Sequence, residues 1–226
     1  MKIILLHGWN QNKEIWGNII SKLSNYNTLA IDLPGFGKEK ITSQDWNITE
    51  YAKWTRKKIA KLTKGNSDIV LIGHSFGGRI ATKIASENPK WLKGLILSGS
   101  PSIYRPKIST KIKIYAYKMI KIFIPHWLKI RFLPIELKRA YLSGMDTIFR
   151  KVVIYDQTNS LNKINVPTLL IWGENDIEVP LHIPKEIATK IKKSDLKIIS
   201  KVGHNSFIDN PDLFTGYVKK FIENIK

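Results

Sequence analysis

The sequence contains no cysteine and no apolar run long enough to cross a bilayer. The first absence excludes disulfides, cysteine-ligated zinc and a thiol nucleophile. The apolar run near the N-terminus, Ile3–Leu6, is too short for a signal peptide and meets a turn at Gly8. We therefore expect a soluble, cytoplasmic protein.

Acidic residues are scarce: 18 Asp and Glu stand against 37 Lys and Arg, which gives a net charge of +19. Residues 101–151 hold twelve of the basic residues and two acids, Glu136 and Asp146, so this segment carries +10. An acidic carrier protein or an anionic membrane surface would be attracted to it. The alternative is that the positive charge only reflects a lysine-rich composition and has no functional role. Nucleic acid is not expected, because no recognised binding module is present.

Apolar runs of strand length alternate with segments of helix length, which predicts an α/β fold with a mostly parallel sheet. The expected strands are 2–6, 28–32, 68–72, 93–98, 168–172 and 196–200. The expected helices are 14–24, 48–62, 76–87, 183–191 and a closing helix from Pro211.

This alternation stops between residues 101 and 161, where no strand pattern is convincing. The segment 107–124 instead places Tyr115 and Met119 on one apolar helical face, with lysines opposite. We therefore divide the chain into a core, residues 1–100 and 162–226, and a helical, lysine-rich insertion, residues 101–161.

The most informative motif is Gly-His-Ser-Phe-Gly at residues 73–77, which directly follows an apolar strand and precedes a helix. This order is typical of a nucleophile elbow, in which a serine sits on a sharp strand-to-helix turn. A Cβ at Gly73 or Gly77 would collide with neighbouring backbone as the chain reverses. Ser75 is the predicted nucleophile.

A serine nucleophile needs a histidine base and a carboxylate that orients the histidine. In the order expected downstream of an elbow, Asp176 and His204 each follow a predicted strand. Glu174 and Glu178 are alternatives to Asp176. The backbone N–H groups of Trp9 and Phe76 are the predicted oxyanion donors.

Five motifs together resemble the α/β-hydrolase superfamily over nearly the whole chain: His7-Gly8-Trp9, the loop 32–37, the elbow 73–78, the loop 173–176 and Gly203-His204. The resemblance implies an α/β-hydrolase fold of about six strands, with helices on both faces and a helical cap inserted after the fourth strand. The family's two N-terminal strands are absent.

Within the superfamily, the chain is most similar to small carboxylesterases of the pimeloyl-acyl-carrier-protein methyl ester esterase type. This implies a serine hydrolase that cleaves carboxylic esters, including carrier-bound acyl esters, through an acyl-enzyme. The alternatives are a thioesterase, a C–C hydrolase or lyase using the same triad, and a non-catalytic binding protein. We expect Trp9, Phe76, Tyr115 and Met119 to contact substrate, and neither a metal nor a cofactor.

Overall fold

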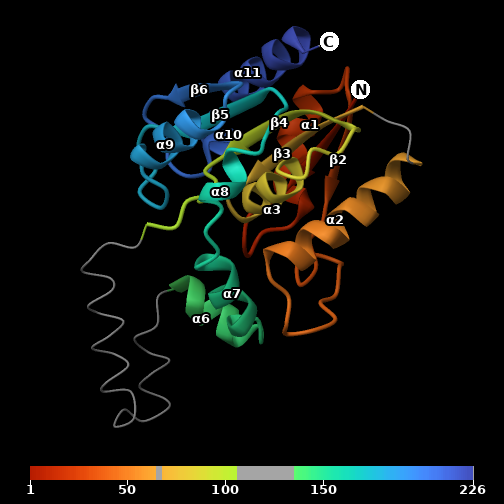
Figure 1. Cartoon of the computed structure of the whole chain (residues 1–226), viewed down its shortest axis with the longest axis vertical. Helices are drawn as coiled ribbons and strands as arrows, with labels where there is room; N and C mark the ends of the chain where they lie inside the picture. The colour runs from red at the N-terminus through yellow and green to blue at the C-terminus, as the bar shows by residue number, and fades with distance from the viewer. Residues whose placement is uncertain (65–67, 106–134, 226) are drawn as a thin grey trace.

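A computed structural model describes residues 1–64, 68–105 and 135–225. Within these residues, six strands form one sheet in the order β2-β1-β3-β4-β5-β6, and every neighbouring pair is parallel (Figure 1). The strands are β1 (Lys2–Leu6), β2 (Asn27–Ile31), β3 (Ile69–His74), β4 (Leu92–Ser98), β5 (Thr168–Gly173) and β6 (Ser194–Ile199). This is the six-stranded parallel sheet predicted from the sequence.

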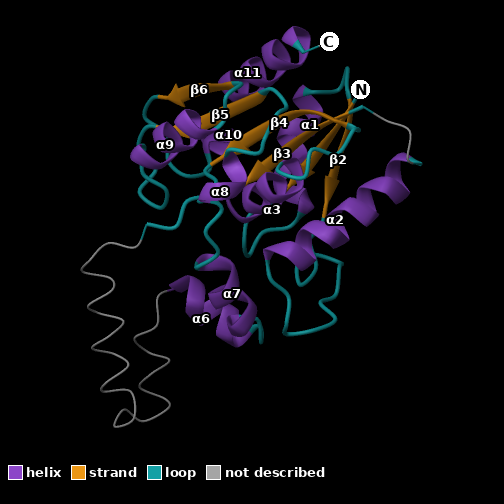
Figure 2. Cartoon of the chain, in the orientation of Figure 1, coloured by secondary structure: helices purple, strands orange, loops and turns teal. Residues whose placement is uncertain are grey.

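Helices cover both faces of the sheet (Figure 2). Helices α2 (Ile48–Thr63), α3 (Ser75–Ala85) and α9 (His182–Lys190) pack on one face, and α1 (Gly17–Lys22) and α11 (Pro211–Asn224) pack on the other. Because side chains alternate along a strand, Ile4 and Leu6 of β1 enter the first layer, whereas Ile3 and Leu5 enter the second. Both faces of the four inner strands are therefore buried, which explains why these strands are almost continuously apolar, whereas the edge strands β2 and β6 are only partly buried.

The element bounds depart from the sequence expectation mainly near the N-terminus. The predicted helix 14–24 is two pieces, a 3₁₀ turn Lys13–Trp16 followed by α1. The Asn12 side chain accepts a hydrogen bond from the N–H of Glu14 and so begins the turn one residue earlier than expected. A short helix not predicted from the sequence, α10 (Ser206–Asp209), also precedes α11.

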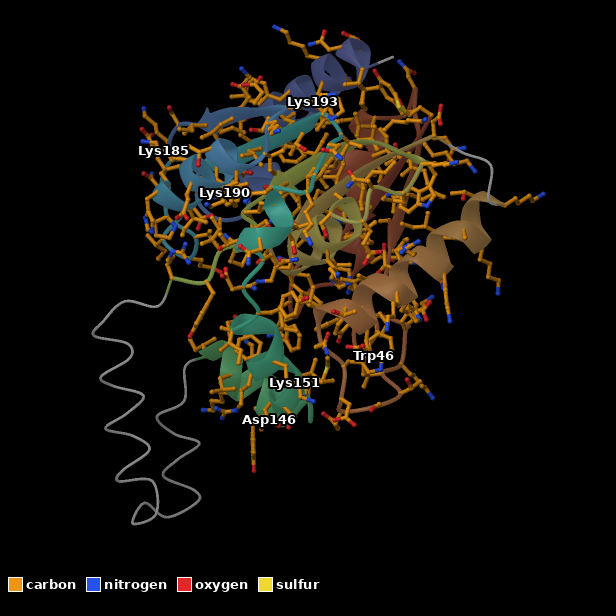
Figure 3. All side chains as sticks on the ribbon, viewed as in Figure 1. Trp46, Asp146, Lys151, Lys185, Lys190 and Lys193 are labelled. Carbon is orange, nitrogen blue, oxygen red and sulfur yellow. The ribbon has the colours of Figure 1, made fainter. Side chains whose placement is uncertain are left out.

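Between β4 and β5 the described residues form three helices, α6 (Ile135–Leu142), α7 (Asp146–Val153) and α8 (Thr158–Leu161). The predicted helix 107–124, with Tyr115 and Met119, lies outside the described residues. The ammonium of Lys151, labelled in Figure 3, donates to the carbonyl of Gln44 and to Asp45, and Gln44 donates to the carbonyl of Gly144. Helices α6 and α7 are thereby joined to the loop that follows β2.

The sheet order reverses at β1, which has β2 on one side and β3 on the other. Ligands of open parallel sheets bind at such a switch point, beyond the carboxyl ends of the strands. His7-Gly8-Trp9 and Ser75 follow the ends of β1 and β3, and so flank the same crevice. Of the helices that the structure describes, none has the length and apolar composition needed to span a bilayer.

Candidate active site

Ser75 lies at the turn between β3 and α3, with a positive φ of 48°. A serine rarely adopts this left-handed conformation, so the turn stores strain at that residue. A Cβ at Gly73 would lie 2.6 Å from the carbonyl oxygen of Gly77, and one at Gly77 would lie 2.5 Å from that of Leu6. The two glycines are therefore required for the strand to reverse into the helix against β1.

Asp176 and His204 come from the loops after β5 and β6 and meet side by side. Nδ1 of His204 lies 2.8 Å from Oδ2 of Asp176, whose side chain is fully buried. The other carboxylate oxygen, Oδ1, accepts hydrogen bonds from the N–H groups of Glu178 and Val179, at 3.0 and 2.8 Å. Three donors therefore hold the Asp176 carboxylate in one orientation, and the carboxylate fixes the imidazole.

The two alternatives to Asp176 lie elsewhere. Glu174 is exposed and accepts from the backbone N–H of Lys201 at 3.1 Å. Oε2 of Glu178 lies 3.5 Å from Nε2 of His204, on the opposite edge of the imidazole from Asp176. Of the three carboxylates in this loop, only Asp176 is placed to orient Nδ1.

The loop after β1 is held close to the elbow. The N–H of Gly8 donates to Oε1 of Gln11 at 2.8 Å, and Nε2 of Gln11 donates to Oδ1 of Asn205, next to His204. Within the described residues, no hydrogen bond from the N–H of Trp9 or of Phe76 is present. Phe76 lies in the first turn of α3, where backbone N–H groups lack helical partners. Both amides are available to an incoming oxygen.

A pocket opens above the elbow and contains both Ser75 and His204. Its walls are mainly apolar and come from the β1 loop, the elbow and helix α7, with Trp9, Phe76, Phe149, Val152 and Val153 among its residues. The indole of Trp9 packs against the rings of Phe36, Phe76 and Phe149 at centroid distances of 4.9, 5.2 and 5.1 Å. Of the four expected substrate-contact residues, Trp9 and Phe76 line the pocket, and Tyr115 and Met119 lie outside the described residues.

Arg79, one turn into α3, is a buried cation beside this pocket. Its guanidinium donates to the carbonyls of Val153 and Tyr155, at and just beyond the end of α7, at distances of 3.1 and 2.7 Å. Burial lowers the pKa of Arg79 to about 10, and the nearby Asp156 opposes that shift. Helix C-termini favour cations, so Arg79 ties the elbow helix to the pocket wall.

Two other histidines, His7 and His74, are fully buried near the site. Burial lowers the pKa of His7 to about 4, although its contact with the Gly8 carbonyl opposes the shift. Burial likewise places the pKa of His74 well below its usual value, with a further lowering from His204, whose ring centroid is 4.8 Å away. Both histidines are neutral at physiological pH and serve as packing and hydrogen-bonding groups.

Asp32 follows β2 and shapes the next loop. It accepts backbone hydrogen bonds from Lys13 and Lys38 at 2.8 and 3.1 Å. Burial by itself raises the pKa of this carboxyl, but the two backbone donors and the nearby charge of Lys13 together outweigh burial, and the pKa is lowered. The side chain fixes the loop and does not line the pocket.

Sequence reasoning missed the roles of three residues at this site, Gln11, Arg79 and Gly99, and named Glu178 only as an alternative to Asp176. Gly99 has a φ of 56°, and a Cβ there would lie 2.8 Å from Cε1 of His204. Of these, Arg79 left a signal in the sequence, as the one charged residue in the first two turns of the elbow helix.

Comparison with known proteins places the chain in a family. Residues 2–119 and 133–211 match the model described as "alpha/beta hydrolase fold". The chain is 31% identical over 253 residues to the pimeloyl-[acyl-carrier protein] methyl ester esterase of Wigglesworthia glossinidia brevipalpis, covering 99% of this chain and 94% of the relative. It is 27% identical to the proline iminopeptidase of Saccharolobus solfataricus, covering 99% and 85%. An esterase structure from Exiguobacterium antarcticum shares the fold, with a TM-score of 0.76, 22% identity and coverage of 99% and 92%.

Proposed function

Because the chain belongs to the α/β-hydrolase family, we propose that it hydrolyses carboxylic esters through an acyl-enzyme formed on Ser75. The observation that carries the proposal is the Asp176–His204 contact of 2.8 Å beside a strained elbow serine in one pocket. Names of relatives support ester hydrolysis as the reaction class. The roles of the individual residues are inferred from their geometry.

In the first half-reaction, Oγ of Ser75 attacks the ester carbonyl carbon and its proton passes to Nε2 of His204. The C–O bond then breaks, and the same nitrogen returns the proton to the departing alcohol. In the second half-reaction, His204 takes a proton from water as its oxygen attacks the acyl-enzyme carbonyl. The bond between the acyl carbon and Oγ of Ser75 then breaks, His204 returns the proton to Oγ, and the acid is released. Asp176 stabilises the imidazolium through Nδ1 in both steps.

The developing oxyanion would be held by the backbone N–H groups of Trp9 and Phe76. Both flank the switch-point crevice, and neither donates a hydrogen bond within the described part of the chain. Such preorganised donors contribute most where water is excluded. The ring contacts of Trp9 place apolar surface on that side of the crevice.

We also propose that residues 101–161 form a cap over this core, residues 1–100 and 162–226. The described part of the cap supports this, because Phe149, Val152 and Val153 of α7 supply one wall of the pocket. The cap would then set which acyl groups reach Ser75.

A carrier-bound acyl ester is the substrate class that we propose for this site. Relatives from several bacteria are named as esterases of pimeloyl-acyl-carrier protein, and this chain carries a net charge of +19, which would attract an acidic carrier. Lys185, Lys190 and Lys193 lie on and beside α9 (Figure 3), and Lys111, Lys118 and Lys121 of the cap lie outside the described residues.

The proposed nucleophile is tested with a fluorophosphonate probe and p-nitrophenyl esters of graded chain length. Wild-type protein and a control with the exposed Ser43→Ala should label at Ser75 and turn over esters, whereas Ser75→Ala should do neither. Thioesters in the same panel separate esterase from thioesterase activity. Absence of both labelling and turnover in the wild type would refute the proposal.

The carrier hypothesis has a separate test. Hydrolysis of a carrier-bound methyl ester should weaken sharply as salt is raised from about 20 to about 500 mM, because surface attraction is screened. Lys111→Glu, Lys118→Glu and Lys121→Glu combined should reduce this activity while sparing p-nitrophenyl acetate. Salt-independent hydrolysis of the carrier substrate would contradict it.

A further inference from the structure

Glu178 is a carboxylate at the pocket that the proposed ester hydrolysis does not use. It lines the pocket with Ser75 and His204, and its side chain is 62% exposed. In the described part of the chain, the pocket contains no other carboxylate, since Asp176 is buried behind the imidazole. The Glu178 carboxylate thus places a negative charge at the pocket of a protein whose net charge is +19.

The backbone around Asp176 fixes where Glu178 lies. The N–H of Glu178 donates to Oδ1 of Asp176 at 3.0 Å, while Oδ2 of Asp176 holds Nδ1 of His204 at 2.8 Å. The Glu178 carboxylate then reaches the other edge of the same ring, with Oε2 3.5 Å from Nε2. One turn of backbone therefore places a carboxylate on each side of the imidazole.

Nε2 is the atom that returns the proton to the departing alcohol in the proposed mechanism. The oxygen of the leaving group must therefore lie within hydrogen-bond reach of Nε2, at about 3 Å. Atoms attached to that oxygen lie in the region that the Glu178 carboxylate borders. We place the acyl chain on the other side of the carbonyl carbon, where Phe149 and Val152 give the pocket apolar walls.

Among the described residues, no lysine or arginine forms an ion pair with Glu178. Arg79 also lines the pocket, but its guanidinium donates to the carbonyls of Val153 and Tyr155 at the end of α7. In the described residues, the side chain of Glu178 forms an ion pair with His204 alone, and only when that histidine is protonated. Among the described residues, Glu178 therefore supplies the negative charge at the leaving-group side of the pocket.

We infer that Glu178 determines leaving-group specificity, favouring esters whose alcohol carries a positive charge over neutral isosteres. The inference rests on the proposed function of Ser75 and His204. A quaternary ammonium a few bonds from the ester oxygen gains a favourable interaction with the carboxylate, whereas a neutral group of the same shape does not. Because the carboxylate is partly exposed, the preference is moderate and depends on salt.

The test compares butyrylcholine with its neutral isostere, 3,3-dimethylbutyl butyrate, followed by acid release in a pH-stat. At low salt, the wild type should prefer the choline ester in kcat/KM, and Glu178→Gln should reduce the ratio of the two values about three- to fivefold. Raising salt to about 500 mM should lower the wild-type ratio and leave that of Glu178→Gln nearly constant. Glu174→Gln is the matched control: it removes the same charge from the same loop, away from the pocket, and should keep the wild-type ratio.

An unchanged ratio in Glu178→Gln, with both esters hydrolysed, would overturn the inference and leave the proposed function standing. An equal fall in Glu174→Gln would also overturn it, since a general charge effect would then explain the ratio. If the wild type cleaves neither these esters nor p-nitrophenyl acetate, both the inference and the proposed function fail.

Discussion

The buried His7 should make this protein lose stability on mild acidification. Its Nε2 accepts the N–H of Leu33 at 3.0 Å, and its Nδ1–H donates to the carbonyl of Gly8 at 2.7 Å. A proton added to Nε2 would face another donor inside a fully buried site. The neutral ring is therefore favoured, and burial lowers the pKa from 6.5 to about 4.

The sign and size of the effect follow from proton linkage. As pH falls through 6.5, the unfolded chain binds a proton at His7 that the folded protein does not bind until about pH 4. The contribution of the neutral His7 to the free energy of unfolding is therefore fully present above pH 6.5 and is lost as the pH falls from 6.5 to about 4. At about 1.4 kcal/mol for each pKa unit, the complete loss from this one residue is about 3 kcal/mol. That is a large part of the roughly 5–15 kcal/mol typical of a folded domain.

The assay is urea unfolding at pH 7 and pH 4.5, for the wild type, His7→Gln and the exposed His182→Gln. His7→Gln should be less stable at pH 7, yet should lose about 2–3 kcal/mol less than the wild type on acidification. His182→Gln should follow the wild type. Equal losses in the wild type and His7→Gln would refute the reasoning, as would a His7 imidazole that titrates near pH 6.5 by NMR in the folded protein.

Three further predictions concern the site. In Asp176→Asn, the amide oxygen should keep the backbone donors of the loop, which turns the NH₂ group toward Nδ1 of His204 and imposes the wrong tautomer. We expect kcat for p-nitrophenyl acetate to fall by about 10³–10⁴. A thermal melt followed by circular dichroism should show that the variant is still folded. Gly173→Ala would place a Cβ 2.1 Å from the carbonyl of Gly203, so the two loops should separate and both stability and kcat should drop; a variant with wild-type kcat would contradict the close approach. Arg79→Met should release the carbonyls at the end of α7 and raise KM more than it lowers kcat, and an unchanged KM would show that the wall is held otherwise.

The strands and most helices were predictable because both faces of the sheet are buried, so apolar runs of strand length stand out against amphipathic helices. Bounds failed where a local side-chain contact decides them. At Asn12, a single side-chain hydrogen bond converts the expected helix start into a 3₁₀ turn. Patterns of hydrophobicity do not contain that information.

The candidate triad was predictable because each member directly follows a strand, and parallel strands end on one edge of a sheet. The sequence favoured Asp176 but left Glu174 and Glu178 open as alternatives for the carboxylate that contacts Nδ1 of His204. The position of each carboxylate depends on the path of the loop, which places Asp176 at Nδ1 of His204 and Glu178 near Nε2 of the same ring. The contact between Gly99 and His204 is equally invisible in the sequence, because it joins residues far apart in the chain.

The attachment of α7 is unequal at its two ends. Near its C-terminus, the buried Arg79 binds the carbonyls of Val153 and Tyr155, and Gln157 donates to the carbonyl of Arg79 at 2.9 Å. Toward α6, Met145 and Ile148 are buried in the core, but the hydrogen bonds that the described residues Lys151 and Gly144 form with the loop after β2 are exposed to solvent. Buried hydrogen bonds open far less often than exposed ones. We therefore expect the hydrogen bonds at the α6 end of α7 to open more often than those at its C-terminal end, so that the part of the pocket wall bound to Arg79 keeps its shape.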